Sequence, residues 1–305
     1  MLKRYDKNPV LKPKLENPWE ARMVFNTAAI YLDEKVHLVY RARGLDGGVS
    51  RFGYASSNDG FHFEERFDYP VFSPDPDNDF ECMGVEDARI TKIENRIYML
   101  YTAYGFVPGI SRRVSQVQLG MTSIDVDDFV NHRWNWSERI YPLFRVDDKN
   151  SFLFPEKIGG KYVMYHRIPP HIWVSYSDDL HEWKHHDLVM KSEFDWEYFK
   201  IGGGSPPHKT EKGWLLVYHA VDRNFTYQLG MAMADLDDPS KIIWRHKEPV
   251  LVPEKDYEKH GEVPNVVFTC GSVVIDGILF VYYGGADTVI GVATAEIDEI
   301  LKKVN

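Results

Sequence analysis

The chain of 305 residues contains only two cysteines, Cys82 and Cys270. Two cysteines cannot form a disulfide framework or a zinc site built from cysteine pairs. The twelve histidines show no HExxH motif or other paired spacing of metal ligands, so no metal site is expected. The fold should therefore depend on a hydrophobic core, which a hydrophobic content of 44% can supply.

Long apolar segments are also missing. The longest apolar runs have the length of a strand, which is too short for a membrane-spanning helix. The first residues, MLKRYDKNPVLKP, lack the apolar centre of a signal peptide. We therefore expect a cytoplasmic protein without a membrane partner.

Positive charge is in deficit, with 36 Lys and Arg residues against 46 Asp and Glu residues and a net charge of −10. A diffuse acidic balance argues against binding to nucleic acid or to anionic membranes. A ligand that carries phosphate would need a local basic cluster.

One strand–turn–strand pattern occurs five times, and each copy ends in a tyrosine. The closing tyrosines are spaced by 61, 64, 53 and 64 residues and are Tyr40, Tyr101, Tyr165, Tyr218 and Tyr282. A repeat of this length indicates an array of similar units. Because no Ser/Gly/Pro-rich linker separates the copies, residues 1–305 are expected to form a single domain.

Each copy has an inner polar segment, a turn, an apolar strand and a third strand. The turns are rich in Gly, Asn and Asp, which tolerate the positive φ angles of tight hairpins. The first three copies continue into an acidic turn and an expected outer strand, at NDGFHFE, DVDDFVNHRW and SDDLHEWKHH. About four antiparallel strands in each of five units predict an all-β fold, a five-bladed β-propeller with a central active-site pocket.

The two ends of the chain have their own signals. NPVLKP near the N-terminus is similar to EPVLVP at residues 248–253, so both are expected to be outer-strand pieces. We expect one terminal strand to pair with the blade at the other end of the chain. The tail DEILKKV predicts a short helix.

The densest polar motif is GVEDARI, residues 84–90, on the expected inner strand of the second unit. Residues two apart on a strand share a face, so Asp87 and Arg89 should point together and Glu86 away from them. Asp87 is a candidate general acid. A structural ion pair between Asp87 and Arg89 explains the motif equally well.

A second set of residues is cationic or donates hydrogen bonds, and lies at the ends of expected strands. Its members are Lys149, Arg167, Lys200, His219 and Tyr227. Together they could bind an oxyanion, although each lysine taken singly is better explained as a solvated loop residue. The glycine run 202–204 lacks the context of a Walker or Rossmann motif and suggests a close approach of backbone at the centre.

A third set suits the hydroxyl groups of a sugar, with an aromatic content of 14% to supply stacking rings. The set comprises Asn26, Arg41, Arg51, Asp59, Asn265 and Asp287. A turn role explains Asp59, within NDG, equally well.

Taken together, these motifs resemble glycoside hydrolase family 130, the mannoside phosphorylases. The motifs that carry the resemblance lie in order from about Phe25 to Ala293 and are FNTAAI, GVEDARI, FPEKIGGKYVMYHR, WEYFKIGGGSPP, GWLLVYHAVD, VPNVVFTCG and YYGGADT. The resemblance implies a five-bladed propeller in which Asp87 is the proton donor. It implies phosphate binding by Lys149, Arg167, Lys200, His219 and Tyr227. It implies substrate binding by Asn26, Arg41, Arg51, Asp59, Arg89 and Asp287. Ala88 stands where many members have proline, which should affect backbone stiffness rather than the acid.

The reaction implied by the resemblance is inverting phosphorolysis of a β-mannoside, with inorganic phosphate as co-substrate, no cofactor, and α-mannose 1-phosphate as product. Inverting hydrolases need a second carboxylate as base on water, whereas phosphate is already an anionic nucleophile. The donor acts directly or, as the family implies, through a hydroxyl of the bound mannose. The style of the FPEKIGGKYVMYHRIPPHIW segment favours β-1,2-mannobiose or short β-1,2-oligomannan, and β-1,4 linkage stays open. Self-association is common in the family, so a homo-oligomer is expected.

Three other functions stay open. A hydrolase of the same fold would lose the phosphate cations and need a carboxylate base, for which Glu156 and Glu197 are candidates. A lectin-like propeller would need neither Asp87 nor the cations. An arabinanase-like or fructan-hydrolase-like enzyme needs an acid in the first blade, where this chain has Asn26. The segments FVPGISRRVSQ and HRIPPHIW, residues 106–116 and 166–173, are expected to shape the acceptor site.

Overall fold

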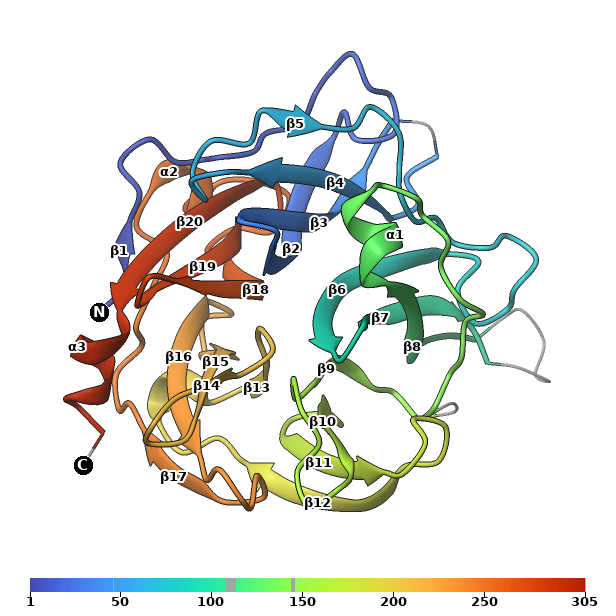
Figure 1. Ribbon diagram of the computed structural model, residues 1–305. Coiled ribbons are helices and arrows are strands. Elements are labelled where there is room, and N and C mark those ends of the chain that lie inside the picture. Colours follow the sequence, from blue (N-terminus) through green and yellow to red (C-terminus); the bar gives the residue numbers. More distant parts are fainter. Residues whose placement is uncertain (46, 108–113, 144–145, 305) are drawn as a thin grey trace.

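Five antiparallel sheets surround a central axis (Figure 1). The computed structural model describes residues 1–45, 47–107, 114–143 and 146–304. The five sheets are the blades of a β-propeller, as the fivefold repeat predicts. No helix in these ranges is both long and apolar enough to cross a membrane.

The sheets follow one another along the chain. The first contains β2 (Met23–Leu32), β3 (Lys35–Arg43), β4 (Arg51–Ser57) and β5 (Glu65–Arg66). The second contains β6 (Gly84–Ile93), β7 (Arg96–Phe106) and β8 (Ser115–Asp125). The third contains β9 (Lys149–Leu153), β10 (Tyr162–Arg167), β11 (Ile172–Ser177) and β12 (Lys184–Met190). The fourth contains β13 (Lys200–Gly203), β14 (His208–Lys209), β15 (Trp214–Val221), β16 (Tyr227–Ala234) and β17 (Ile242–Arg245). The fifth contains β18 (Val267–Ile275), β19 (Ile278–Gly285), β20 (Val289–Glu296) and β1 (Lys3–Arg4).

Neighbouring sheets pack face to face through buried apolar side chains. Each neighbouring pair shares a core cluster, represented around the ring by Val39 with Val85, Leu119 with Leu153, Phe152 with Leu216, Leu215 with Leu279, and Phe280 with Leu38. Because both faces of a sheet are covered, its central strand can be apolar throughout. All eight residues of β15 are buried accordingly.

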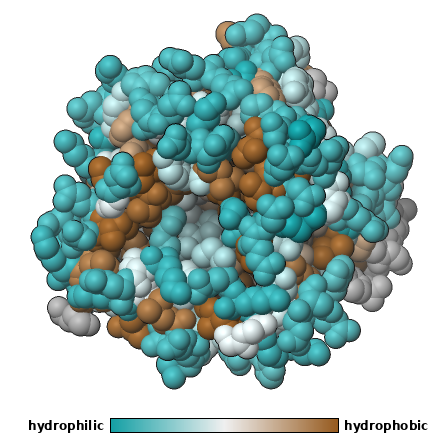
Figure 2. All heavy atoms as spheres, in the orientation of Figure 1, coloured by the Kyte–Doolittle hydropathy of each residue, from teal (hydrophilic) through white to brown (hydrophobic). Residues whose placement is uncertain are grey.

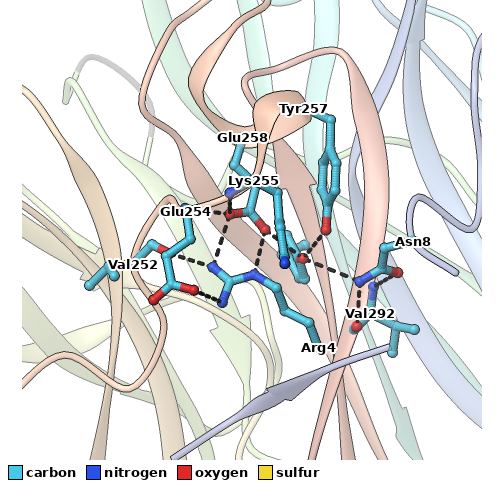
Figure 3. A network of polar contacts seen from close by, with 9 residues as sticks. Arg4, Asn8, Val252, Glu254, Lys255, Tyr257, Glu258 and Val292 are labelled. Carbon is cyan, nitrogen blue, oxygen red and sulfur yellow. Dashed lines mark hydrogen bonds and ion pairs between the residues drawn. The ribbon is translucent and has the colours of Figure 1, made fainter. Parts of the chain in front are cut away.

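The N-terminus closes the ring. β1 pairs antiparallel with β20, so the first strand of the chain completes the last sheet, as predicted. Figure 3 shows Arg4 of β1 reaching across to Glu258, with its Nε 2.7 Å from one carboxylate oxygen and Nη2 2.9 Å from the other. Both chain ends lie beside this sheet (Figure 1).

The two similar terminal segments are both outer pieces, as predicted. Leu11 of NPVLKP forms a bridge with Ile290 of β20, and Leu251 of EPVLVP forms one with Leu229 of β16. Each therefore extends the outer edge of a sheet.

The repeated tyrosines have a structural role. Tyr40 donates a hydrogen bond to Glu20 at 2.8 Å, and its ring covers Gly53 on the next strand, where a Cβ atom would lie 2.4 Å from the ring. Equivalent tyrosine–glutamate bonds of 2.6 to 2.8 Å join Tyr101 to Glu81, Tyr218 to Glu197 and Tyr283 to Glu258. These four glutamates have no exposed surface, and each pairs with an arginine: Arg66, Arg139, Arg245 and Arg4.

Two expectations about the blades need correction. In the fifth blade the tyrosine in register with the others is Tyr283, opposite Gly291, while Tyr282 donates to the Gly60 carbonyl at 2.9 Å.

In the second blade DVDDFVNHRW begins with the helix α1 (Val126–Val130) instead of an outer strand. Two aspartates in the first turn favour a helix start, and Phe129 buries its ring in the core. The tail forms the predicted short helix, α3 (Ile297–Leu301).

Candidate active site

A cavity of about 170 Å³ lies where the five blades meet. Its lining residues come from every blade and are Asn26, Arg41, Glu86, Asp87, Lys149, Asn150, Arg167, Lys200, His219, Tyr227, Val263, Val266, Phe268 and Asp287. Figure 2 shows one face of the disc hollowed near its centre. The structure thus brings together Asp87, all five residues predicted to bind phosphate, and three of those predicted to bind sugar.

Three inner strands reach the cavity through residues in left-handed conformation. Asn26, Asp87 and Asn150 have φ angles of 45°, 53° and 60°. Each lies at a register shift between the inner strand and its neighbour. Asn and Asp tolerate this conformation better than other non-glycine residues, and such bulges re-aim a side chain.

The bulge at Asp87 breaks the alternation expected for β6. Glu86 and Asp87 both line the cavity, so the prediction that Glu86 points away is wrong. Nη1 of Arg41 donates to Asp87 Oδ1 at 3.0 Å, and Nη2 of Arg41 pairs with Glu86. Asn26 Nδ2 donates to the same Asp87 oxygen at 2.9 Å.

These contacts decide the charge of Asp87. Burial is the strongest influence and acts to raise the pKa of the carboxyl group. The charges of Arg41 and Arg89, with the hydrogen bonds from Asn26 and Arg41, outweigh burial and lower the pKa below its ordinary value. Asp87 is therefore held as a carboxylate.

Arg89 does not pair with the Asp87 carboxylate. Its buried guanidinium donates to the carbonyl oxygens of Asp87 at 2.7 Å, Gly203 at 2.9 Å and Gly204 at 3.0 Å. Arg89 therefore ties the second blade to the fourth and is absent from the cavity lining. The alternative explanation of the motif, an ion pair between Arg89 and Asp87, is therefore wrong, because the bulge turns the carboxylate toward Arg41.

The glycine run gives the close backbone approach that was predicted. A Cβ atom at Gly202 would lie 2.6 Å from the His219 ring, and one at Gly203 would lie 2.6 Å from the Asn150 carbonyl oxygen. Only glycine allows β13 to pass so near to its neighbours.

The cations stand at strand ends around the cavity. Lys149 and Lys200 are the first residues of β9 and β13, and Arg167 is the last residue of β10. Burial, followed by the nearby charge of Arg167, lowers the pKa of Lys200 to about 8. Burial and then Arg167 lower the pKa of Lys149 as well. Both lysines belong to a crowded basic cluster and are not solvated loop residues.

His219 is buried and neutral. Burial and the surrounding cations, Arg167 first, hold its pKa well below the usual range. Asn150 lies between two groups, with Oδ1 3.4 Å from Arg89 Nη2 and Nδ2 3.3 Å from His219 Nε2. Because arginine only donates, the Asn150 oxygen faces Arg89 and its amide nitrogen donates to His219 Nε2.

The proton of His219 therefore lies on Nδ1. Among the described residues, neither His219 Nδ1 nor Arg167 Nε has a hydrogen-bond partner, although both atoms are buried. Buried donors are normally paired. Two unpaired donors within a basic cluster mark a place for an anion.

Asp287 supplies a third carboxyl group to the cavity and differs from Asp87. It has a φ angle of 53° and follows β19. Burial raises the pKa of Asp287 to about 7, with Arg41 opposing and the negative charges of Asp87 and Glu86 adding to the rise. The cavity thus holds one carboxyl with a lowered pKa and one with a raised pKa.

Besides Arg89, the residues considered for sugar binding that lie outside the cavity lining are Arg51, Asp59 and Asn265. Arg51 begins β4 opposite Ala42. Asp59 follows the other end of β4, where its Oδ1 accepts hydrogen bonds from Ser57 Oγ and from the backbone nitrogens of Phe61 and His62 at 2.8 to 2.9 Å. The structure gives Asp59 the turn role.

The carboxylates considered for a hydrolase also lie elsewhere. Glu156 pairs with Lys209 at 2.6 Å, and Glu197 is buried against Tyr218 and Arg245. Across the described ranges, no group of three or more His, Cys, Asp or Glu side chains is placed to hold a metal ion.

Of the two segments expected to shape the acceptor site, one is described in full. HRIPPHIW connects β10 to β11, and its Pro170 carbonyl accepts a hydrogen bond from Ile201 of β13 at 3.0 Å. Most of FVPGISRRVSQ, residues 108–113, lies outside the described residues.

Sequence reasoning missed Asn150, Glu86 and three apolar lining residues. A signal for Asn150 was present, since Asn26, Asp87 and Asn150 occupy equivalent places before the apolar part of three inner strands. The apolar residues Val263, Val266 and Phe268 carried no such signal.

The fold is shared with a solved structure of a mannoside phosphorylase. The β-1,2-mannobiose phosphorylase from Listeria innocua, solved with β-1,2-mannobiose, superposes with a TM-score of 0.83 over 99% of both chains at 27% identity. Residues 1–305 match the family model described as beta-1,4-mannooligosaccharide phosphorylase, and the chain belongs to glycoside hydrolase family 130, as predicted.

Two relatives from Thermoanaerobacter sp. (strain X514) are similar over nearly their whole length. The chain is 46% identical over 306 residues to a 1,2-beta-oligomannan phosphorylase, and 98% of each chain is covered. It is 45% identical over 312 residues to a beta-1,2-mannobiose phosphorylase, again with 98% of each covered.

Proposed function

We propose that this protein catalyses the phosphorolysis of β-1,2-linked mannosides by inorganic phosphate and releases α-mannose 1-phosphate. The observation that carries the proposal is the basic cluster beside Asp87, with its two unpaired buried donors. The two relatives named for β-1,2-mannosides support this linkage over β-1,4. No cofactor is needed, since phosphate is itself the nucleophile.

The basic cluster suits a phosphate dianion. Burial lowers the pKa of Lys149, Arg167 and Lys200, and the charge of Arg167 lowers the pKa of both lysines further. An anion bound among them would stabilise their charged forms. Arg167 Nε and His219 Nδ1 would donate to phosphate oxygens as charge-assisted hydrogen bonds. Tyr227 completes the wall, with Lys200 Nζ 5.2 Å from its ring centroid.

The chemical step needs a proton on Asp87. Asp87 is close enough to Lys149 for its charge to act on the lysine, so a dianion bound at Lys149 would in turn raise the pKa of Asp87. A phosphate oxygen then forms a bond to the anomeric carbon while the glycosidic bond breaks on the opposite face. The proton passes from Asp87 to the leaving oxygen, directly or through a hydroxyl of the mannose.

Hydrolysis is the less favoured alternative. Hydrolysis requires a carboxylate that activates water, and it leaves Lys149, Arg167 and Lys200 without a role. Glu86, one of the two other carboxyl groups in the cavity, is already paired with Arg41. Cytoplasmic location and self-association remain predictions from the sequence.

The test is an incubation with β-1,2-mannobiose and β-1,4-mannobiose, each with and without inorganic phosphate, in which mannose 1-phosphate and free mannose are measured. Mannose 1-phosphate formed from the β-1,2 disaccharide only when phosphate is present is the expected result. Free mannose released without phosphate would establish hydrolysis instead. Preferential cleavage of the β-1,4 disaccharide would overturn the proposed linkage.

A further inference from the structure

Three exposed aromatic side chains lie on the chain segments that also carry lining residues of the cavity. Tyr198, Phe199 and Phe225 are 52%, 49% and 62% exposed, and we call them the rim cluster. Phe199 immediately precedes Lys200, and Phe225 lies two residues before Tyr227, so both neighbours of the rim cluster line the cavity.

The two chain segments that carry the rim cluster lie side by side. The Phe199 backbone nitrogen donates to the Val221 carbonyl at 2.8 Å, and Val221 pairs with Tyr227 across the β15–β16 hairpin. The rings of Phe199 and Phe225 have centroids 5.1 Å apart. Lys200 Nζ lies 6.0 Å from the Phe199 ring centroid and 5.2 Å from that of Tyr227, so it joins the rim to the cavity.

The exposed side chain of Phe225 belongs to a residue whose backbone conformation is unfavourable. It has a φ angle of 60°, a conformation that a bulky residue adopts with strain. The turn is held by Asp222, whose Oδ1 accepts from the backbone nitrogens of Asn224 at 2.8 Å and Thr226 at 2.9 Å. Gly or Asn would suit this turn better, so the turn itself does not require the ring.

We propose that the rim cluster binds a mannosyl residue of the substrate beyond the bond that is cleaved, so that the enzyme prefers β-1,2-oligomannan to β-1,2-mannobiose. This inference rests on the proposed function. Sugar rings present apolar C–H faces that suit aromatic rings and hydroxyls that suit neighbouring donors. Arg223, 3.5 Å from the Tyr198 ring centroid, provides such a donor at the edge of the rim cluster.

The size of the cavity supports the same conclusion. A volume of about 170 Å³ is below the roughly 300–1,000 Å³ of pockets that enclose drug-sized ligands. A chain longer than a disaccharide must therefore extend past the cavity wall. Sequence identity does not decide the preferred length of the substrate, because the oligomannan and mannobiose phosphorylases are 46% and 45% identical to this chain.

The experiment compares kcat/KM for β-1,2-mannobiose, mannotriose and mannotetraose. The test variant is Phe225→Asn, which removes the ring and keeps a residue that tolerates the left-handed turn. We expect kcat/KM for the triose and tetraose to fall roughly two- to tenfold, the range of an aromatic contact, with mannobiose little changed. Phe225→Tyr, which keeps an aromatic ring, should keep the preference for the triose and tetraose over mannobiose. Tyr31→Ala is the matched control, because Tyr31 is exposed on β2 and lines a separate hollow.

An equal fall for all three substrates, or no change in their ratio, would overturn the proposal. So would a change in the sedimentation coefficient of Phe225→Asn with an unchanged ratio, which would make the rim cluster a self-association surface. Calorimetric binding of the tetraose to Asp87→Asn, with and without Phe225→Asn and without phosphate, needs no turnover. This measurement separates the binding role of the rim cluster from the proposed phosphorolysis. If Phe225→Asn abolishes tetraose binding, the rim cluster binds the substrate even when mannose 1-phosphate is never formed.

Discussion

Lys200 should give phosphate use a specific dependence on pH. Its pKa is lowered to about 8, first by burial and then by Arg167, so Lys200 is charged below pH 8 and neutral above it. Only the charged form can make a charge-assisted hydrogen bond to phosphate. The value of kcat/KM for phosphate, which reports the enzyme form that binds phosphate, should therefore fall as the pH rises through about 8.

The size of the fall follows from the interaction lost. A hydrogen bond to a charged group contributes about 1.5–3 kcal/mol, which corresponds to a factor of roughly 10 to 150 in kcat/KM. The fall should stop once Lys200 is neutral, because Arg167 stays charged throughout. The loss of charge on Lys200 should itself change binding of the mannoside little, since Lys200 belongs to the proposed phosphate site.

The assay is initial-rate measurement at varied phosphate from about pH 6.5 to about pH 9.5. Lys200→Arg is the matched variant, because arginine keeps its charge over this range, and its profile should lose the fall near pH 8. If Lys200→Arg showed the same fall as the unmodified protein, another group would be responsible and the reasoning about Lys200 would be refuted.

Three further predictions concern the acid, the histidine and ring closure. Asp87→Asn should abolish turnover while calorimetry still detects phosphate binding; near-normal activity would exclude Asp87 as the donor. His219→Asn, whose amide can take the place of Nδ1, should raise KM for phosphate less than His219→Gln, and the reverse order would place the proton on Nε2. Arg4→Ala leaves the buried Glu258 without its cation and should lower the free energy of unfolding by about 3–5 kcal/mol in denaturant melts. Arg22→Ala, in an exposed pair, should cost about 1 kcal/mol or less, and equal losses would contradict the closure role of Arg4.

The sequence by itself determined the propeller, because its signals are local. Hairpin turns and alternating strands are set by residues close together in the chain, and five copies of one pattern leave few other architectures. Local signals failed where a neighbour in space decides. DVDDFVNHRW forms α1 because Phe129 packs into the core of the first two blades. Tyr283, and not Tyr282, takes the anchor position because Glu258 and Gly291 meet it there.

The sequence also located most of the candidate site, since residues at corresponding strand ends converge on the axis of a propeller. Period-two alternation misplaced Glu86 and Arg89, because a left-handed residue between them shifts the register of β6. The tertiary structure alone decided the electrostatics. The lowered pKa of Lys200, the neutral state of His219 and its proton on Nδ1 arise from burial and from charges on three different blades. Such groups lie far apart in the chain and meet only when the ring of blades is closed.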